Sequence, residues 1–368
     1  MKLRLFAFCL SLFTLALAAS AQSPYISRVF EYVPAPGQFV NMIPEWEEGD
    51  EAEDMRRKAE ESIANHNNQM ITLGAWGGYV TFGFDHMVKN LRGRYDFKIV
   101  GNSVYSTSAW SDSTRVGGSA EPGIVMVSYD ANGNGEPDDE WYELAGSEYR
   151  NPATRHDYAC TYYRPAADHV AVADPEDKFI TDTAYVYWTD NYEGAGYVNK
   201  ISFHRQNYYP NWIEADAMTF NGTRLPDNGV DERAQGNNFV LYCYDWGYAD
   251  NHPNYSKYEQ GDESVPEYLR HVSEFKIDWA VDGKGKRVWL PGIHFVKVYT
   301  AVNQFNGWIG EESTEVQDAW DLHMLDAQGK AVTEEEEEED PSPYDMDGDG
   351  WLTIDDIREL MRIYLEKK

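Results

Sequence analysis

The chain has 368 residues, and its 63 acidic side chains outnumber its 31 basic ones, which gives a formal net charge of -32 at pH 7. Such an excess of negative charge repels phosphate backbones and argues against nucleic acid as a partner. Three cysteines in a chain of this length are too few for a disulfide-stapled scaffold.

Residues 1–21 have the pattern of a secretory signal peptide. Lys2 and Arg4 form a short basic start, an apolar run follows, and Ala19-Ser20-Ala21 is a small-residue cleavage site. No later apolar stretch approaches the roughly 20 residues that a membrane helix requires. The sequence therefore predicts an exported protein without a membrane span, located at the cell surface, in the periplasm or outside the cell.

The segment 22–332 has the pattern of an antiparallel β-sandwich preceded by one exposed helix, which we expect over residues 51–65. Turn residues recur about every ten positions, and β-branched and aromatic residues fill the intervals. Where apolar and polar residues alternate, we expect strands with one buried and one hydrated face. Cys160 and Cys243 lie in such strand-like sequence, either as a disulfide or as two buried thiols. The predicted strands include residues 79–84, 96–100, 123–129, 183–188, 198–204, 239–244, 274–279 and 293–300.

Residues 130–140, D-A-N-G-N-G-E-P-D-D-E, resemble a calcium loop. Oxygen-bearing side chains stand at positions one, three and five, and Gly135 stands at position six, as such loops require. Trp141 occupies position twelve and no helix follows, so an acid from residues 138–140 would complete the shell. The alternative is a hairpin turn rich in Asp and Asn that is stabilised by its own side-chain hydrogen bonds. The expected calcium ligands are Asp130, Asn132, Asn134, Glu136 and Asp139.

Aromatic residues are plentiful and gather in several turn-like segments. Exposed Trp and Tyr rings offer flat faces to sugar rings or large conjugated ligands, although most such rings in a sandwich belong to the core. Polar groups beside an aromatic ring have the composition of a binding loop. We therefore take as candidate ligand-binding residues Trp212, Asp245, Trp246, Asn251 and Trp308.

The sequence contains none of the common catalytic motifs, such as H-E-x-x-H, G-x-S-x-G or C-x-x-C. A pair of carboxylates for glycoside hydrolysis could still come from many acids. For a hydrolase, we would test Glu311, Glu312 and Glu315 first. Their alternative role is that of a polar edge strand and turn.

Residues 333–343 form an acidic linker, because a run of like charges repels itself and two prolines follow it. The segment 344–368 then has a second calcium loop followed by a short helix. The last position of this loop is an Asp rather than the longer Glu, which resembles the loops of dockerin modules. A full dockerin has two loop-helix repeats and this sequence shows one, so the tail could cap the chain, pair with another copy or act as a sorting signal. The expected ligands in the tail are Asp345, Asp347, Asp349, the carbonyl of Trp351, and Asp356.

Three segments, at residues 71–86, 121–147 and 294–316, resemble a family of secreted cell surface proteins from gut and oral anaerobic bacteria. The resemblance covers roughly residues 25–326. It implies a jelly-roll fold of the galactose-binding type, displayed outside the inner membrane. It also implies a link to outer-membrane nutrient uptake, with corrinoids such as vitamin B12 among the ligands and an uptake receptor as a partner.

These observations predict an exported, non-catalytic, calcium-binding surface protein whose aromatic loops bind a glycan or another bulky nutrient such as a corrinoid. One alternative is a secreted glycan-active hydrolase that uses paired carboxylates. The other is a purely structural surface protein that its calcium loops make rigid.

Overall fold

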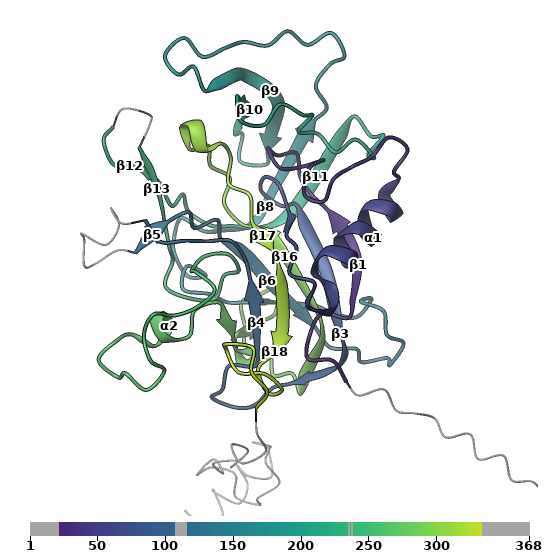
Figure 1. Ribbon diagram of the computed structural model, residues 1–368, viewed down its shortest axis with the longest axis vertical. Coiled ribbons are helices and arrows are strands. Elements are labelled where there is room, and N and C mark those ends of the chain that lie inside the picture. Colours follow the sequence, from purple (N-terminus) through teal and green to yellow (C-terminus); the bar gives the residue numbers. More distant parts are fainter. Residues whose placement is uncertain (1–21, 107–115, 235, 237, 333–368) are drawn as a thin grey trace, which may run out of the picture.

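The computed structural model describes residues 22–332 except 107–115, 235 and 237, and the predicted signal peptide, linker and calcium tail lie outside these residues. The described chain is mainly β and is built from antiparallel sheets with few helices, as the sequence predicts (Figure 1). Within residues 22–332, no helix is long and apolar enough to cross a membrane.

The largest sheet has six strands and forms the centre of the molecule (Figure 1). One face of this sheet is apolar because alternate side chains, such as Phe82 and Val296, point into the main core. In spatial order its strands are β1 (Arg28–Val33), β3 (Tyr79–Lys89), β16 (Gly292–Thr300), β6 (Gly123–Ser128), β7 (Trp141–Leu144) and β15 (Ala280–Val281).

A second layer of short sheets and one helix covers that apolar face. Phe97 and Phe275 stack there with ring centroids 5.2 Å apart, and Met55 of the helix is fully buried in the same core. The layer consists of the sheet β14 (Glu274–Phe275), β4 (Phe97–Val100) and β18 (Asp318–Asp321), the pair β17 (Glu315–Val316) and β2 (Ile71–Thr72), and the helix α1 (Ala52–Ile63).

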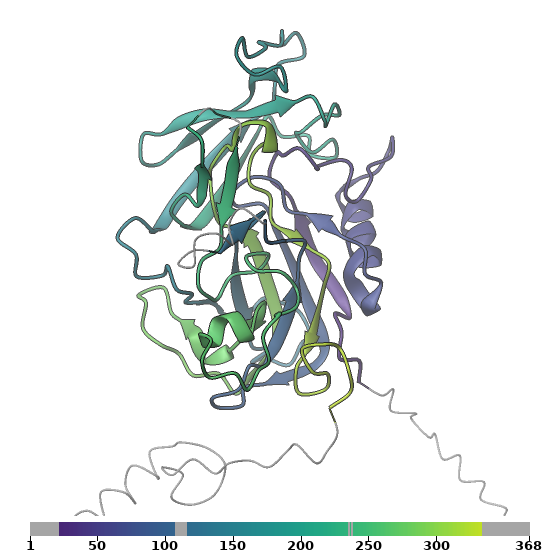
Figure 2. The ribbon, with the colours of Figure 1, turned by 60° about the vertical axis from the view of Figure 1, so that its left-hand side comes forward.

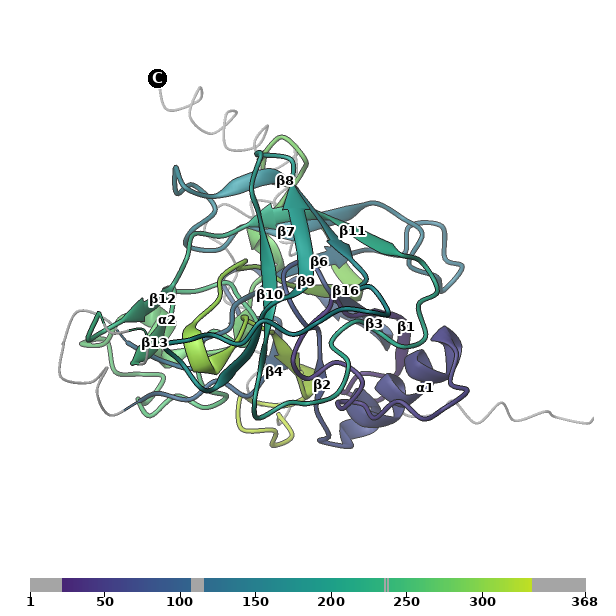
Figure 3. The same ribbon diagram turned by 90° about the horizontal axis from the view of Figure 1, so that it is seen from above.

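A four-stranded sheet lies above the central sheet (Figures 2 and 3) and has its own smaller core. Tyr162 and Phe220 point into this core, while the opposite face is hydrated. The order of this sheet is β10 (Ala195–Ile201), β9 (Ile180–Asp190), β8 (Arg155–Tyr163) and β11 (Ala217–Arg224). The remaining elements are the sheet β12 (Gly229–Asp231), β13 (Phe239–Tyr242) and β5 (Gly117–Gly118), the helix α2 (Glu267–Arg270), and the 3-10 turns η1 (Ala64–His66), η2 (Ile277–Trp279) and η3 (Gly307–Ile309).

The predicted helix over 51–65 corresponds to α1, which begins and ends slightly inside those bounds. The Asp54 carboxylate accepts the N–H of Glu51 at 3.1 Å, which closes the start of the helix. Arg56 pairs with acids one turn away on either side, as i,i+3 and i,i+4 spacing allows. One face of the helix is nevertheless buried against the core, so its exposure is partial.

The single strand predicted over residues 274–279 is wrong: this segment forms β14 and then the turn η2. The reason is the buried side chain of Asp96. Its carboxylate accepts the N–H of Ile277 at 2.7 Å, in place of a neighbouring strand's carbonyl. Because this bond draws the backbone away from the strand pairing, the strand ends after two residues.

The two cysteines of the described chain, Cys160 and Cys243, are free thiols. The expected alternative of a disulfide between them is therefore wrong.

Lys98 of β4 is a buried cation, with only 1% of the residue exposed. Its ammonium nitrogen lies 5.0 Å from the centre of the Tyr255 ring and 5.7 Å from that of Trp320. Desolvation lowers the pKa of Lys98 to about 8, although Glu274 and Asp326 partly oppose this effect. The aromatic rings therefore compensate only part of the cost of burying the charge.

Replacing Lys98 with Met should stabilise the protein at pH 7, by roughly 1–3 kcal/mol, because it removes a desolvated charge. Wild-type lysine loses its proton in the folded protein near pH 8 and in the unfolded chain near the ordinary pKa of 10.5. Wild-type stability should therefore rise between these pH values, and the advantage of the variant should shrink. Urea unfolding from pH 7 to 10.5 measures this. A variant that is less stable at every pH would contradict the account.

Candidate functional site

The predicted calcium loop connects β6 to β7 and folds around the side chain of Asp130. One carboxylate oxygen of Asp130 accepts the backbone N–H groups of Gly133 at 2.7 Å and Asn134 at 3.1 Å. The other accepts the N–H of Gly135 at 2.9 Å. The two glycines have φ values of 71° and 73°, a backbone conformation that glycine adopts without strain. The loop therefore curves tightly around the first predicted ligand.

The amide and acid side chains that follow complete a network within the loop. Asn132 Oδ1 accepts the N–H of Asn134 at 2.9 Å, and Asn134 Oδ1 accepts that of Glu136 at 2.8 Å. The side-chain amides of both asparagines donate to Asp138, each at 3.0 Å. The Asn132, Asn134 and Asp138 oxygens each accept one of these bonds and keep a second lone pair, which a cation could use.

Two further predicted ligands behave differently from each other. Asp139 closes the loop, because its carboxylate accepts the N–H of Ala131 at 2.9 Å. The side chain of Glu136 turns away and pairs with Arg28 at 3.1 Å. At position seven of a calcium loop the backbone carbonyl is the ligand, so this outward side chain is compatible with the pattern.

The charge of Asp130 is stabilised within the loop. Desolvation acts to raise the pKa of its carboxyl, but the three backbone N–H donors outweigh it and hold that pKa below its ordinary value. Both interpretations of the loop, a hairpin turn rich in Asp and Asn or a calcium loop, contain these hydrogen bonds. What distinguishes them is whether stability depends on calcium.

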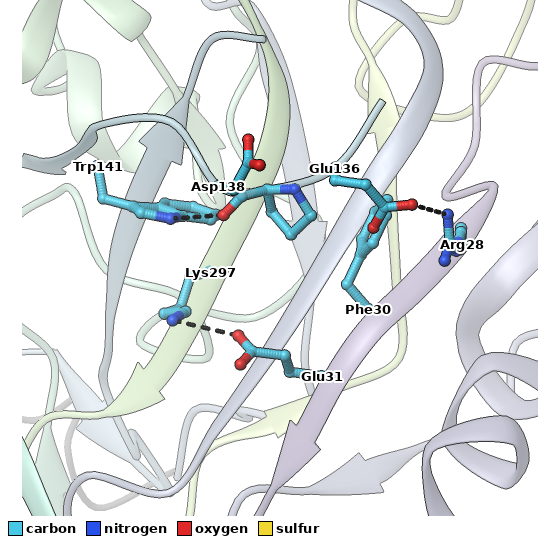
Figure 4. Close-up of a pocket in the computed structure, with 8 residues that line it drawn as sticks. Arg28, Phe30, Glu31, Glu136, Asp138, Trp141 and Lys297 are labelled. Atoms are coloured by element: carbon cyan, nitrogen blue, oxygen red, sulfur yellow. Dashed lines mark hydrogen bonds and ion pairs between the residues drawn. The ribbon is translucent and has the colours of Figure 1, made fainter. Parts of the chain in front are cut away.

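A groove on the outer face of the central sheet lies directly beside this loop (Figure 4). It is an open hollow of about 410 Å³ that combines two aromatic rings with acidic and basic side chains. Its lining comes from β1, from β16, and from the end of the loop where β7 begins. The lining residues are Arg28, Phe30, Glu31, Glu136, Pro137, Asp138, Trp141 and Lys297.

Trp141 is the larger of the two aromatic side chains that line the groove, and two neighbours hold its ring in place. Its indole N–H donates to the carbonyl of Pro137 at 3.3 Å. Lys297 Nζ lies 5.2 Å from the ring centroid and pairs with Glu31 at 3.4 Å (Figure 4). The ring is thus fixed between the calcium-type loop and a lysine of β16.

Four charged side chains of the groove form ion pairs, Arg28 with Glu136 and Lys297 with Glu31. Arg28 packs over the Phe30 ring at 4.4 Å while its guanidinium reaches Glu136. Such pairs are half-exposed, so they contribute little to stability, but they keep donors and acceptors at fixed positions. A ligand with several hydroxyl groups would meet both kinds of partner here.

A β-bulge in β1 explains why Phe30 and Glu31 both face the groove. The pairing of β1 with β3 shifts register between Val29 and Glu31, which leaves Phe30 as an extra residue. Val29 and Tyr32 still point into the core. Residues 28, 30, 31 and 297 were not among the predicted site residues, although the alternation along H-F-V-K-V-Y does place Lys297 on the hydrated face.

The predicted ligand-binding residues do not form one surface, and none of the five lines the groove. Trp212 is only 8% exposed and belongs to the main core, where it stacks on Tyr32. Asn251 is buried, and its side chain accepts the N–H and donates to the carbonyl of Tyr244, each at 2.8 Å. Both residues therefore have structural contacts instead of a free face.

Of the other three predicted residues, Asp245 and Trp246 are neighbours in the chain and Trp308 lies in a separate segment. Trp246 packs on Trp279 with ring centroids 4.6 Å apart, and Asp245 beside it is exposed. Trp308 on η3 is 40% exposed and meets the edge of Phe203. These positions offer single rings rather than an enclosed site.

A row of tyrosines crosses the hydrated face of the four-stranded sheet. Tyr163, Tyr187 and Tyr197 stand on three adjacent strands, with neighbouring ring centroids 5.6 and 5.3 Å apart. About two fifths of each residue is exposed. Cross-strand aromatic pairs of this kind stabilise a sheet, and none of these three tyrosines lines the groove beside Trp141.

The acids considered for hydrolysis are buried. Glu311, Glu312 and Glu315 are 5%, 1% and 1% exposed. Desolvation raises the pKa of each carboxyl, for Glu311 to about 8. None of the three lines the groove, so a polysaccharide chain bound there would not reach them.

A comparison of the sequence with models of known protein families gives no match, and a comparison with curated proteins gives none either.

Replacing Trp212 with Ala should cost about 3–5 kcal/mol of unfolding free energy, because it leaves a cavity in the core. The matched change Trp308→Ala should cost about 1 kcal/mol or less, since that ring is partly in solvent. Chemical denaturation of the two variants provides the comparison. Similar losses for both would show that Trp212 does not have the core role described here.

Proposed function

We propose that the protein is an exported, calcium-stabilised binding protein that holds a neutral glycan in the groove beside the 130–140 loop. The observation that supports this proposal is the shared position of Trp141. Its ring forms a wall of the groove, and its indole N–H is bonded to the loop that has the spacing of calcium ligands.

The chemistry of the groove favours a sugar over other ligands. A sugar ring presents apolar C–H groups to an aromatic face and hydroxyl groups to charged neighbours. Trp141 and Phe30 supply the faces, while Glu31, Asp138 and Lys297 supply acceptors and donors. The net charge of -32 disfavours polyanions. A hollow of about 410 Å³ suits one or two sugar rings better than a whole corrinoid.

Calcium would act on the groove through the loop. A cation bound by Asp130, Asn132, Asn134 and the neighbouring acids would fix the backbone that carries Pro137 and Trp141. A ligand that binds a fixed ring loses less entropy than one that binds a mobile ring. We therefore expect calcium to strengthen binding without contacting the ligand.

The rest of the proposal concerns residues outside those that the structure describes. The signal peptide at 1–21 would export the protein, and the linker at 333–343 would separate the sandwich from the calcium tail at 344–368. An outer-membrane uptake receptor would be a natural partner for such a nutrient-binding protein.

Two alternative functions follow from the sequence. The hydrolase is not favoured, because its candidate acids do not include an accessible pair of carboxylates. A purely structural role is the outcome if no ligand is found.

Binding should be detectable as thermal stabilisation of the mature chain, residues 22–368, in calcium with a panel of glycans and with cobalamin. Replacing Trp141 with Ala should weaken the binding of the best ligand at least tenfold, while Tyr187→Ala, an exposed ring on the other sheet, should leave it unchanged. Isothermal titration measures both variants. A ligand whose affinity depends on Tyr187 and not on Trp141 would place the site on the four-stranded sheet instead.

Replacing Asp130 with Ala should lower the melting temperature in calcium by several degrees more than it does in chelator, because only one condition loses a bound ion. Asp282→Ala is a matched control. Its carboxylate likewise accepts two backbone N–H groups, from Lys284 and Lys286, in a turn without calcium spacing. For Asp282→Ala, the melting temperature should fall by the same amount in calcium and in chelator. Equal losses for Asp130→Ala as well would identify the loop as a metal-free turn.

A further inference from the structure

Three carboxylates from distant parts of the sequence meet inside the sandwich, and none of them belongs to a predicted calcium loop. Glu121 precedes β6, Asp250 follows β13, and Glu315 begins β17. They are 8%, 1% and 1% exposed. One oxygen of each lies within 4.8 Å of the corresponding oxygen of the other two. Together we call them the buried carboxylate triad.

Asp250 is held by backbone donors from two segments. Its Oδ1 accepts the N–H groups of Asn102 at 2.7 Å and Ser103 at 2.8 Å, and its Oδ2 accepts that of Glu315 at 3.0 Å. A side chain at Gly101 would not fit, because its Cβ would lie 2.3 Å from Asp250 Oδ1. The chain is therefore shaped closely around this carboxylate.

The other two carboxylates are only partly satisfied. Glu121 accepts the N–H of Ser313 at 2.9 Å. One oxygen of Glu315 accepts the hydroxyls of Thr72 at 3.1 Å and Ser313 at 2.9 Å. The other oxygen of Glu315, Oε2, is buried and has no hydrogen-bond partner among the residues that the structure describes. A buried carboxylate oxygen without a partner loses its hydration and gains nothing in return.

In the described part of the chain, the triad carries like charges without a basic partner. Within residues 22–332, outside the gaps noted above, none of the three carboxylates forms an ion pair with Lys, Arg or His. Like charges at this separation repel strongly in a protein interior. A stable fold therefore requires either a cation between the carboxylates or protons on them.

We propose that the triad binds a structural divalent cation, calcium by the class of its ligands. Calcium accepts oxygen ligands at 2.3–2.6 Å, so two oxygens on one ion lie up to about 5 Å apart, which the triad satisfies. The ligand set contains no imidazole or thiolate, the groups that zinc and copper prefer. Glu315 Oε2, which accepts no hydrogen bond, is available as a metal ligand.

This ion would connect segments that adjoin three different sheets. Glu315 lies in the β17–β2 pair, Asp250 holds the chain after β4, and Glu121 leads into the central sheet. The site would therefore link the second layer to the central sheet from inside. None of the three carboxylates lines the groove or belongs to the 130–140 loop.

The test is the calcium content of the full mature chain after exchange into metal-free buffer with a small known excess of calcium. The double variant Asp130→Asn, Asp349→Asn weakens the two loops predicted from the sequence and leaves the triad intact. Mass spectrometry under native conditions should still show one tightly bound calcium in this variant. A folded double variant without any bound calcium would overturn the proposal.

A second pair of variants tests the triad directly. Glu315→Gln keeps the shape of the side chain but removes its charge, and it should lose one calcium per chain and the corresponding stabilisation by calcium. The matched control, Glu311→Gln, changes a buried glutamate outside the triad and should keep the calcium content of the wild type. If Glu315→Gln retains its calcium, or is at least as stable as the wild type in calcium, the triad is protonated and not a metal site. If Glu315→Gln does not fold, the calcium content of the double variant Asp130→Asn, Asp349→Asn decides whether the triad binds calcium.

Discussion

The arrangement of this protein depends on the requirement that strands of the central sheet bury their apolar side chains in the core and turn the charged side chains between them toward solvent. Val296 and Val298 of β16 enter the main core, so Lys297 between them must face outward. The same requirement operates on β1, where the bulge at Phe30 turns two consecutive side chains toward solvent. The groove beside Trp141 is a product of this constraint, because its lining comes from the outward positions of both strands.

Charge imposes a second constraint. A chain with 63 acidic residues must give each carboxylate that it buries a stabilising partner, since an unpaired buried carboxylate is costly. In the loop at 130–140, backbone N–H groups stabilise Asp130 at the surface. In the buried triad, such donors satisfy only part of the oxygens. The two places thus present the same ligand chemistry, one open to solvent and one enclosed.

Much of the fold could be predicted from the sequence because the signals are local. Period-two alternation marks the strands, and the loop spacing from Asp130 marks a turn that gathers oxygen ligands. Strand pairing is not local: β1 reaches the groove only because it pairs with β3, which in turn pairs with β16 more than 200 residues away in sequence. For this reason the sequence did not reveal Phe30 or Lys297 as site residues. Trp212 was predicted as a ligand contact because an aromatic residue in turn-like sequence gives no local sign of being buried.

The sequence also contains no local sign that Glu315 is buried. Acidic residues are almost always exposed, and the composition of the short segment E-E-S-T-E is typical of a polar turn. Only the three-dimensional structure brings Glu121 and Asp250 to it. Local polarity therefore predicts where a chain meets water, except where separate segments meet to form an internal site.

The central claim is that the loop around Asp130 binds calcium and thereby prepares the groove for a ligand. It is tested most directly by measuring the affinity of the mature chain for its best glycan, with calcium and after chelation, at a temperature where both forms are folded. The account predicts that chelation weakens binding at least tenfold in the wild type and has little effect in Asp130→Ala, which already binds weakly. An affinity that is the same with and without calcium would contradict it.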